Sequence, residues 1–380
     1  MYYSLTRATS WNVVGYLYLI IASLIATPIL VHSLGLSQFA QYSLIIATLG
    51  LVSTFNLGLP QAVTRALSRD HEFSLRRQTL WVTSSLLFIL TGIIAGIVAT
   101  IACYLLGVGQ SALPSIFLIA LMSNVLSHYT TLPQAEGHFG YFNAKTFIVG
   151  TGNTLLAAYL SWIGQSLTII LSVQLACYLL TLFALAYFSL KFFPRPWSYK
   201  PSLVVAQPLI AFGLKNQAGT LVGQVQAQYA KYLLVALSPL SLSGYVIAQG
   251  LVQKAAGAVT QVSSALYPAS ARVGTHNIRP LYYRLQFGLF FLALLGIGIY
   301  ELVGYSFLSW WLHSSELVSI VDSVLKVMVW YFAVLVLCPL ASTMLDSRGR
   351  PELTSLFTLV TTVIEISLAF ILFPRFGLFA

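Results

Sequence analysis

The chain has 380 residues, of which 58% are apolar and 7% are Asp, Glu, Lys or Arg, and its formal net charge is +10. A soluble globular chain carries roughly 25% charged residues, so the composition excludes a soluble enzyme, a soluble nucleic-acid-binding protein and a disordered chain. We predict an all-α integral membrane protein. Its apolar runs, for example residues 86–90 and 93–99, lack the polar–apolar alternation of outer-membrane strands.

The spacing of the charges predicts the number of membrane spans. Three long stretches contain no Asp, Glu, Lys or Arg, namely those from Arg7 to Arg65, from Arg77 to Glu136 and from Lys145 to Lys191. Each stretch has room for two helices of about 20 residues and a tight turn. We predict about 11 transmembrane helices, at residues 11–33, 40–66, 79–106, 113–134, 146–163, 167–190, 208–236, 242–270, 286–309, 318–345 and 353–373.

The basic residues predict the orientation. With the N-terminus in the cytoplasm, most Lys and Arg fall in the inner segments, and the predicted outer turns within the first six helices contain none. The positive net charge is therefore a topology signal, which favours anionic membrane lipid as a partner and not nucleic acid. The first helix is expected to be a retained signal anchor.

Motifs for metal, redox or phosphate-loop chemistry do not occur. Cys103, Cys177 and Cys338 are isolated and fall inside predicted helices, where packing is the expected role. No Gly-rich phosphate loop is present. We expect no catalytic residue, no metal and no cofactor.

The second half of the sequence echoes the first. A shift of 203 residues places Tyr42 on Tyr245, Arg69 on Arg272, Arg76 on Arg279 and Asn12 on Lys215. The alternative is that basic inner loops recur at similar intervals in any multi-pass protein. We interpret the echo as a duplication with an N-terminal six-helix bundle at 1–190, a cytoplasmic linker at 191–207 and a C-terminal bundle of helices 7–11 at 208–380. The second bundle is expected to lack its last helix.

The opening of the chain resembles a known transporter family. Residues 34–42 (LGLSQFAQY) lead into an apolar run and then into Phe55-Asn56-Leu57-Gly58-Leu59. Similar stretches are 134–137 (QAEG), 244–248 (GYVIA) and Gly349-Arg350. Together they resemble the polysaccharide (O-antigen repeat-unit) flippases of the multidrug/oligosaccharidyl-lipid/polysaccharide exporter superfamily, although Ser43 and Asn56 stand where Gly and Asp are usual.

The resemblance implies a MATE-like pair of bundles around a central cavity and alternating access in the bacterial inner membrane. The implied substrate is an undecaprenyl-pyrophosphate-linked oligosaccharide for O-antigen, lipopolysaccharide or capsule synthesis. The implied partners are membrane lipid and other polysaccharide-assembly proteins.

Polar residues inside predicted helices are the candidate site, because charge within a membrane is costly. Helices 7 and 8 each carry a stripe of amides and lysines, which suit sugar hydroxyls and a pyrophosphate. The predicted substrate-binding residues are Lys215, Gln217, Gln224, Gln228, Lys231, Gln249, Gln253, Lys254, Lys326, Asn12 and Tyr42, and Glu365 is a predicted ion-coupling residue.

Simpler interpretations exist for several of these residues. Buried glutamines commonly join transmembrane helices. Asp322 and Lys326 are spaced to neutralise each other on one helix, and Lys254 could pair with Glu365. Tyrosines such as Tyr42 often belong to an interfacial belt.

Rival functions are a multidrug antiporter for organic cations within the same superfamily and, with less support, a membrane-embedded polysaccharide polymerase or ligase. The intramembrane tally of four lysines against three acids favours an anionic substrate, and the short predicted outer loops disfavour an enzyme.

The predicted orientation can be tested with reporter fusions. Fusions after Arg76, Pro196 or Arg279 should report the cytoplasm, and fusions after Gly109 or Gln165 should report the outer side, because basic residues stay inside. An outer-side signal at Arg279 would contradict the predicted arrangement of the two halves.

Overall fold

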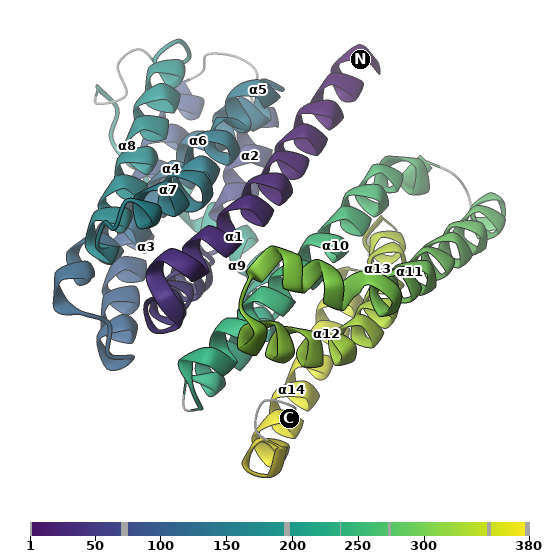
Figure 1. Ribbon diagram of the computed structural model, residues 1–380. Coiled ribbons are helices and arrows are strands. Elements are labelled where there is room, and N and C mark those ends of the chain that lie inside the picture. Colours follow the sequence, from purple (N-terminus) through teal and green to yellow (C-terminus); the bar gives the residue numbers. More distant parts are fainter. Residues whose placement is uncertain are drawn as a thin grey trace. The chain divides into compact units, whose positions relative to one another are not determined.

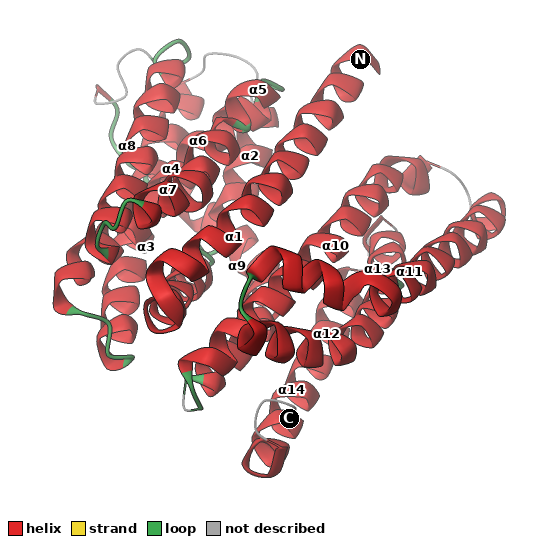
Figure 2. Cartoon of the chain, viewed as in Figure 1, coloured by secondary structure: helices red, strands yellow, loops and turns green. Residues whose placement is uncertain are grey.

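The structure is a computed structural model, and it describes the backbone of residues 2–69, 75–193, 198–235, 237–272, 275–347 and 351–376. Within these ranges the chain is helical and contains no strand (Figures 1 and 2). The all-α class predicted from the composition is confirmed. The chain divides into two compact units, Met1–Gln228 and Tyr229–Ala380. The boundary between these units lies inside helix Leu203–Leu234. The linker at 191–207 between two repeated bundles stays a prediction from the sequence.

The first unit begins with long helices that follow the predicted order. Its elements are α1 (Tyr2–Val52), α2 (Leu59–Arg69), α3 (Leu75–Leu105), the 3-10 turn η1 (Gln110–Ala112), α4 (Leu113–Ala135), α5 (Phe139–Phe142), α6 (Ala144–Thr151), the π-helical turn η2 (Gly152–Leu156), α7 (Ala157–Trp162), α8 (Leu167–Ser189) and most of α9 (Leu203–Leu234).

The second unit contains the end of α9 and the remaining helices. These are α10 (Pro239–Arg272), α11 (Thr275–Leu312), α12 (Ser315–Leu335), α13 (Cys338–Ser347) and α14 (Pro351–Phe376). Predicted helix 10 is interrupted at Val336 and Leu337, between α12 and α13.

Seven helical stretches within the described ranges are long and apolar enough to cross a membrane. They are Val14–Val52, Leu75–Leu105, Gln110–Ala135, Leu167–Ser189, Tyr282–Leu312, Ser315–Ser342 and Glu352–Arg375. The predicted number is about eleven. The first stretch contains most of predicted helix 1 and part of helix 2. Predicted helix 5 is divided among α6, η2 and α7, and α9 contributes the shorter apolar segment Leu203–Leu214. The chain is a multi-pass membrane protein.

The turn predicted between helices 1 and 2 is shorter in the structure. Residues 34–39 were expected to form a loop, but helical geometry continues on both sides of Gly35, which alone is non-helical with φ 71° and ψ 164°. Glycine tolerates this positive φ because it has no Cβ. The break is therefore confined to one residue.

Helices α3 and α4 pack closely. Gly92 and Gly96 lie one helical turn apart on α3, and a Cβ at either position would overlap Leu121 or Phe117 on α4. Lipid supplies no hydrophobic driving force between transmembrane helices, so they associate through close packing. Small residues at this spacing allow that close packing. Fully buried side chains such as Ile116 and Ala99 fill the core beside this contact.

A buried ion pair joins the same two helices at their other end. Arg77 on α3 pairs with Glu136, which follows α4, and the Arg77 side chain is only 3% exposed. The ring of Phe193 lies 5.8 Å from the Arg77 guanidinium. The sequence assigns Arg77 to the basic inner loops, and the structure gives it this second, structural role.

The segment 53–58 between α1 and α2 forms a sharp elbow where the sequence predicts a continuous helix 2. Asn56 closes it with its own side chain, because its Nδ2 donates to the Ser53 carbonyl at 3.1 Å and its Oδ1 accepts from the Gly58 N–H at 3.1 Å. Leu57 and Gly58 then adopt positive φ values of 54° and 64°. This local bonding competes with helix formation, which explains why the apolar run does not stay helical.

The elbow contacts α9 backbone to backbone. A Cβ added to Gly58 would collide with the backbone of Gly213, and a Cβ added to Gly213 would collide with the Leu57 carbonyl. One helical turn further along α9, the amide of Gln217 donates to the Thr54 carbonyl. The paired glycines therefore bring Gln217 within reach of the elbow.

We expect Gly213→Ala to destabilise the protein, since the added methyl group must displace backbone, and overpacking of this kind costs about 1–3 kcal/mol. Gly223 on the same helix is the matched control, because a Cβ there meets open space. Gly223→Ala should hold or raise the melting temperature, since Ala is the better helix former by about 1 kcal/mol. Equal melting temperatures for the two purified variants would contradict the glycine contact.

Candidate functional site

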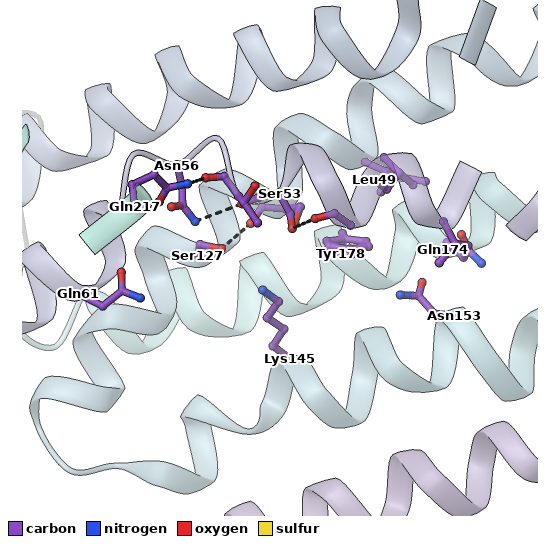
Figure 3. A pocket seen from close by; sticks show the side chains of 15 residues that line it. Leu49, Ser53, Asn56, Gln61, Ser127, Lys145, Asn153, Gln174, Tyr178 and Gln217 are labelled. Atoms are coloured by element: carbon purple, nitrogen blue, oxygen red, sulfur yellow. Dashed lines mark hydrogen bonds between the residues drawn. The ribbon is translucent and has the colours of Figure 1, made fainter. Parts of the chain in front are cut away.

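A polar cavity of about 390 Å³ lies inside the first unit. Its walls come from the end of α1, the elbow, α2, α4, α6, η2, α8 and α9 (Figure 3). The lining residues are Ile46, Leu49, Gly50, Ser53, Thr54, Asn56, Gln61, Ile119, Ser123, Ser127, Lys145, Asn153, Gln174, Tyr178 and Gln217. Eleven of these fifteen have a polar or charged side chain, which is unusual within an apolar bundle and marks the cavity as the candidate site.

One wall depends on the π-helical turn η2. A π turn inserts one residue into a helix and is frequent at functional sites. Here it presents Asn153 to the cavity, and the backbone carbonyl of Asn153 accepts a hydrogen bond from the Tyr42 hydroxyl at 3.0 Å. Gln174 on α8 donates to the same hydroxyl at 2.7 Å, and Tyr178 forms side-chain hydrogen bonds with Asn153 and Ser123. Tyr42 thus links three of the elements around the cavity.

The elbow forms another part of the wall. Figure 3 shows Gln217 of α9 and Asn56 side by side at this end of the cavity, with the Gln217 amide directed at the Thr54 carbonyl. Ser53 and Ser127 also face this region, and their hydroxyls donate to the carbonyls of Gly50 and Ser123 at 2.7 and 2.9 Å. The polar groups of the elbow are therefore largely engaged by the protein itself.

Lys145 is the charged residue of the cavity. It lies in the first turn of α6, and its side chain extends into the space between Gln61 and Asn153 (Figure 3). Within the described ranges its ammonium has no hydrogen-bond acceptor and no carboxylate partner, and the amide of Gln61 is likewise without a partner. No Asp or Glu lines the cavity, and no cluster of metal-ligating side chains occurs among the residues described.

The structure places part of the predicted helix 7 stripe at this cavity. Gln217 is buried and lines it. Gln224 and Gln228 are half-buried, and the Gln228 amide lies near Gly50 of α1. The side chains of Lys215 and Asn12 lie outside the described residues.

The predicted helix 8 residues belong to the second unit. Gln249 is buried, with its Nε2 3.4 Å from the Tyr245 hydroxyl, whereas Gln253 is exposed. The Lys254 ammonium donates to the Gly250 carbonyl at 3.2 Å. Lys231, at the end of α9, is half-buried.

The remaining predicted residues also have local partners. Lys326 pairs with Asp322 at 2.8 Å on the same helix, and its side chain is 56% exposed. The Asp322 carboxylate also accepts from Tyr300 at 2.7 Å. Glu365 accepts a hydrogen bond from Tyr229 at 3.1 Å. The structure thus shows the simpler interpretation for Lys326, and gives Glu365 a tyrosine as a partner.

Two cavity features escaped the sequence reasoning. Lys145 was counted among the basic residues of an inner loop, because it stands at the edge of a long uncharged stretch. Tyr42 was predicted to contact substrate, but it is buried behind the wall and holds Gln174 and the Asn153 backbone in place. Lys145 stands immediately before the predicted helix 146–163, and nothing in the sequence distinguishes it from the other basic residues at membrane edges.

Comparison with known proteins identifies the family. The family model described as polysaccharide biosynthesis protein matches residues 5–273. The chain belongs to this family. No curated protein matches the chain.

Solved structures with the same fold are membrane transporters. An inward-facing multidrug resistance MATE family transporter of the MOP superfamily aligns with a TM-score of 0.71 and 16% identity, covering 94% of this chain and 88% of that one. An outward-facing multidrug resistance MATE family transporter aligns with a TM-score of 0.64 and 16% identity, covering 99% of this chain and 89% of that one.

A MOP superfamily transporter from Pyrococcus furiosus aligns with a TM-score of 0.58 and 16% identity, covering 99% of this chain and 88% of that one. It is described as having a binding pocket of reverse polarity that suggests a different function. The predicted MATE-like fold is confirmed.

We expect Tyr42→Phe to loosen the cavity wall. The variant leaves the Asn153 carbonyl and the Gln174 amide each short of one partner, at a cost of about 1 kcal/mol in the membrane. Tyr159→Phe is the control, since Tyr159 is 53% exposed. Melting of the purified variants should show a decrease for Tyr42→Phe alone, and an unchanged value would contradict the linking role of Tyr42.

Proposed function

We propose that the chain is a flippase that moves a polyprenyl-pyrophosphate-linked oligosaccharide across the bacterial inner membrane by alternating access, with its N-terminus in the cytoplasm. Membership of the polysaccharide biosynthesis family and the MATE-like fold support a flippase or exporter. The polyprenyl-linked substrate, the bacterial inner membrane and the cytoplasmic N-terminus are our proposal.

The observation that carries the proposal is the chemistry of the cavity. It combines amides and hydroxyls with one ammonium, and no carboxylate lines it. Amides and hydroxyls both donate and accept, as the hydroxyls of a sugar require. The ammonium favours an anionic group. A lipid-linked saccharide presents both features in one head group.

The second unit supplies further groups for the proposed path. We assign Lys254, Lys231, Gln249 and Gln253 to contacts with the moving head group, since charged and polar side chains in a membrane are usually functional. Glu365 remains our candidate for ion coupling. The hydrogen bond from Tyr229 to Glu365 links α9 to α14. A change of charge at Glu365 would therefore alter a contact of the helix that also carries Gln217.

A multidrug antiporter is the second candidate, because two of the structural neighbours are described as multidrug resistance transporters. An organic cation would be repelled by Lys145 and would find no carboxylate in this cavity. The reverse pocket polarity described for the Pyrococcus furiosus transporter is a precedent for this fold with a different function. The cavity therefore favours the saccharide.

Deletion of the gene tests the proposal. Lipid-linked oligosaccharide should accumulate on the inner leaflet, surface glycan should decrease, and the wild-type gene should restore both, because the proposed carrier of the head group is absent from the deletion strain. Sensitivity to organic cations is measured in the same strains and should not change. Intact surface glycan together with a gain of cation sensitivity would favour the antiporter.

A further inference from the structure

Lys145 is placed where its charge is costly. Its ammonium enters a cavity inside a helical unit of a membrane protein, and within the described ranges no acceptor or carboxylate meets it. An unpaired charge away from bulk water is strongly unfavourable unless something neutralises it. A group that costs stability and holds no structural contact is expected to serve a ligand.

Some polar side chains of the cavity are bonded to the protein itself, and others remain available to bind a ligand. Asn56 closes the elbow, Gln217 is bonded to Thr54, and Gln174 is bonded to Tyr42. Lys145 keeps all three of its donors, and Gln61 keeps its whole amide. Gln174 keeps one N–H after its bond to Tyr42. The available groups are therefore mainly donors, and they line one cavity together with a single cation.

We propose that this cavity is a phosphoryl-binding site, in which Lys145 pairs with the anion and Gln61 and Gln174 donate hydrogen bonds to its oxygens. A phosphoryl group has several acceptor oxygens and no need of an acceptor in return, which matches a donor-rich lining. The site deepens the proposed function and rests on it for the source of the ligand, namely the head group of a lipid carrier. A free phosphate or pyrophosphate has the same chemistry.

The size and the position of the cavity agree with this ligand. At about 390 Å³ it lies near the lower end of ligand pockets, so it holds a head group portion and not a whole lipid-linked oligosaccharide. In the predicted orientation, α6 begins at the cytoplasmic side. Lys145 is then in the inner half of the membrane, where a substrate made in the cytoplasm must first bind.

The binding test uses the full-length purified protein in nanodiscs and inorganic pyrophosphate as the probe. Pyrophosphate should raise the melting temperature of the wild type by mass action. Lys145→Met keeps the length of the side chain and removes its charge, so it should weaken pyrophosphate binding about tenfold or more. Lys145→Arg should retain most of the affinity. Lys191→Met, which removes an exposed lysine outside the cavity, should bind as the wild type does.

A second measurement protects the test against simple misfolding. Without ligand, Lys145→Met should melt at the same temperature as the wild type or higher, because it removes an unpaired charge. Pyrophosphate binding of equal affinity in Lys145→Met and the wild type would overturn the site. So would a lower melting temperature in Lys145→Met together with no pyrophosphate binding by the wild type, since Lys145 would then be structural.

Competition identifies the source of the phosphoryl group. Polyprenyl pyrophosphate added to the nanodiscs should displace the inorganic probe if the lipid head group is the ligand. Lysine-dependent pyrophosphate binding without such displacement would support the anion site with a free oxyanion as its ligand. This second result, combined with normal glycan in the deletion strain, would contradict the proposed function and leave the site intact.

Discussion

Hydrocarbon offers no hydrogen-bond partners, so every backbone group that leaves a transmembrane helix must be satisfied by the protein. Two interruptions among the described residues of the first unit lie at the cavity, the elbow at 53–58 and the π turn η2. A side chain from another helix takes a carbonyl at each: Gln217 bonds to Thr54, and Tyr42 bonds to Asn153. Both interruptions line the cavity. The cavity thus exists where helical regularity is lost and side chains repair it.

The first unit also contains a closely packed apolar region apart from this cavity. Along α3 and α4, paired glycines and small side chains allow close packing, and fully buried apolar residues fill the contact. Beside the cavity, Gly58 of the elbow meets Gly213 of α9 backbone to backbone. Close contact at one glycine pair fixes the elbow to α9, and this holds Gln217 at the cavity wall. The rigid contacts therefore position the polar ones.

Charge is arranged differently in the two units. In the first, Arg77 near the start of α3 is neutralised by Glu136, while Lys145 faces a cavity without a carboxylate. In the second, Lys326 is paired with Asp322, and Glu365 is bonded to Tyr229. A buried pair is largely neutral to a passing ligand, whereas a cation among neutral amides selects for anions. The surroundings of Lys145 therefore support our proposal that an anionic group binds in this cavity.

The amino-acid sequence by itself determined the class and family of the protein, because both follow from the average properties of long segments. A low charge content leaves only a membrane protein, and helices near 113–134 and 167–190 could be placed to within a residue or two because nothing interrupts their apolar runs. The resemblance carried by short stretches such as Asn56-Leu57-Gly58 pointed to the family that the comparison then identified.

Only the tertiary structure decided the site. Helix 2 was expected to run through Asn56, but the bonding of that side chain to its own backbone and the glycine contact with α9 produce an elbow. Tyr42 was expected at the substrate, and it lies behind the wall as a linking residue. Lys145 seemed to be one of many basic residues at a membrane edge. Its importance comes from which helices surround it and from the lack of a carboxylate among them, and no local pattern in the sequence records either.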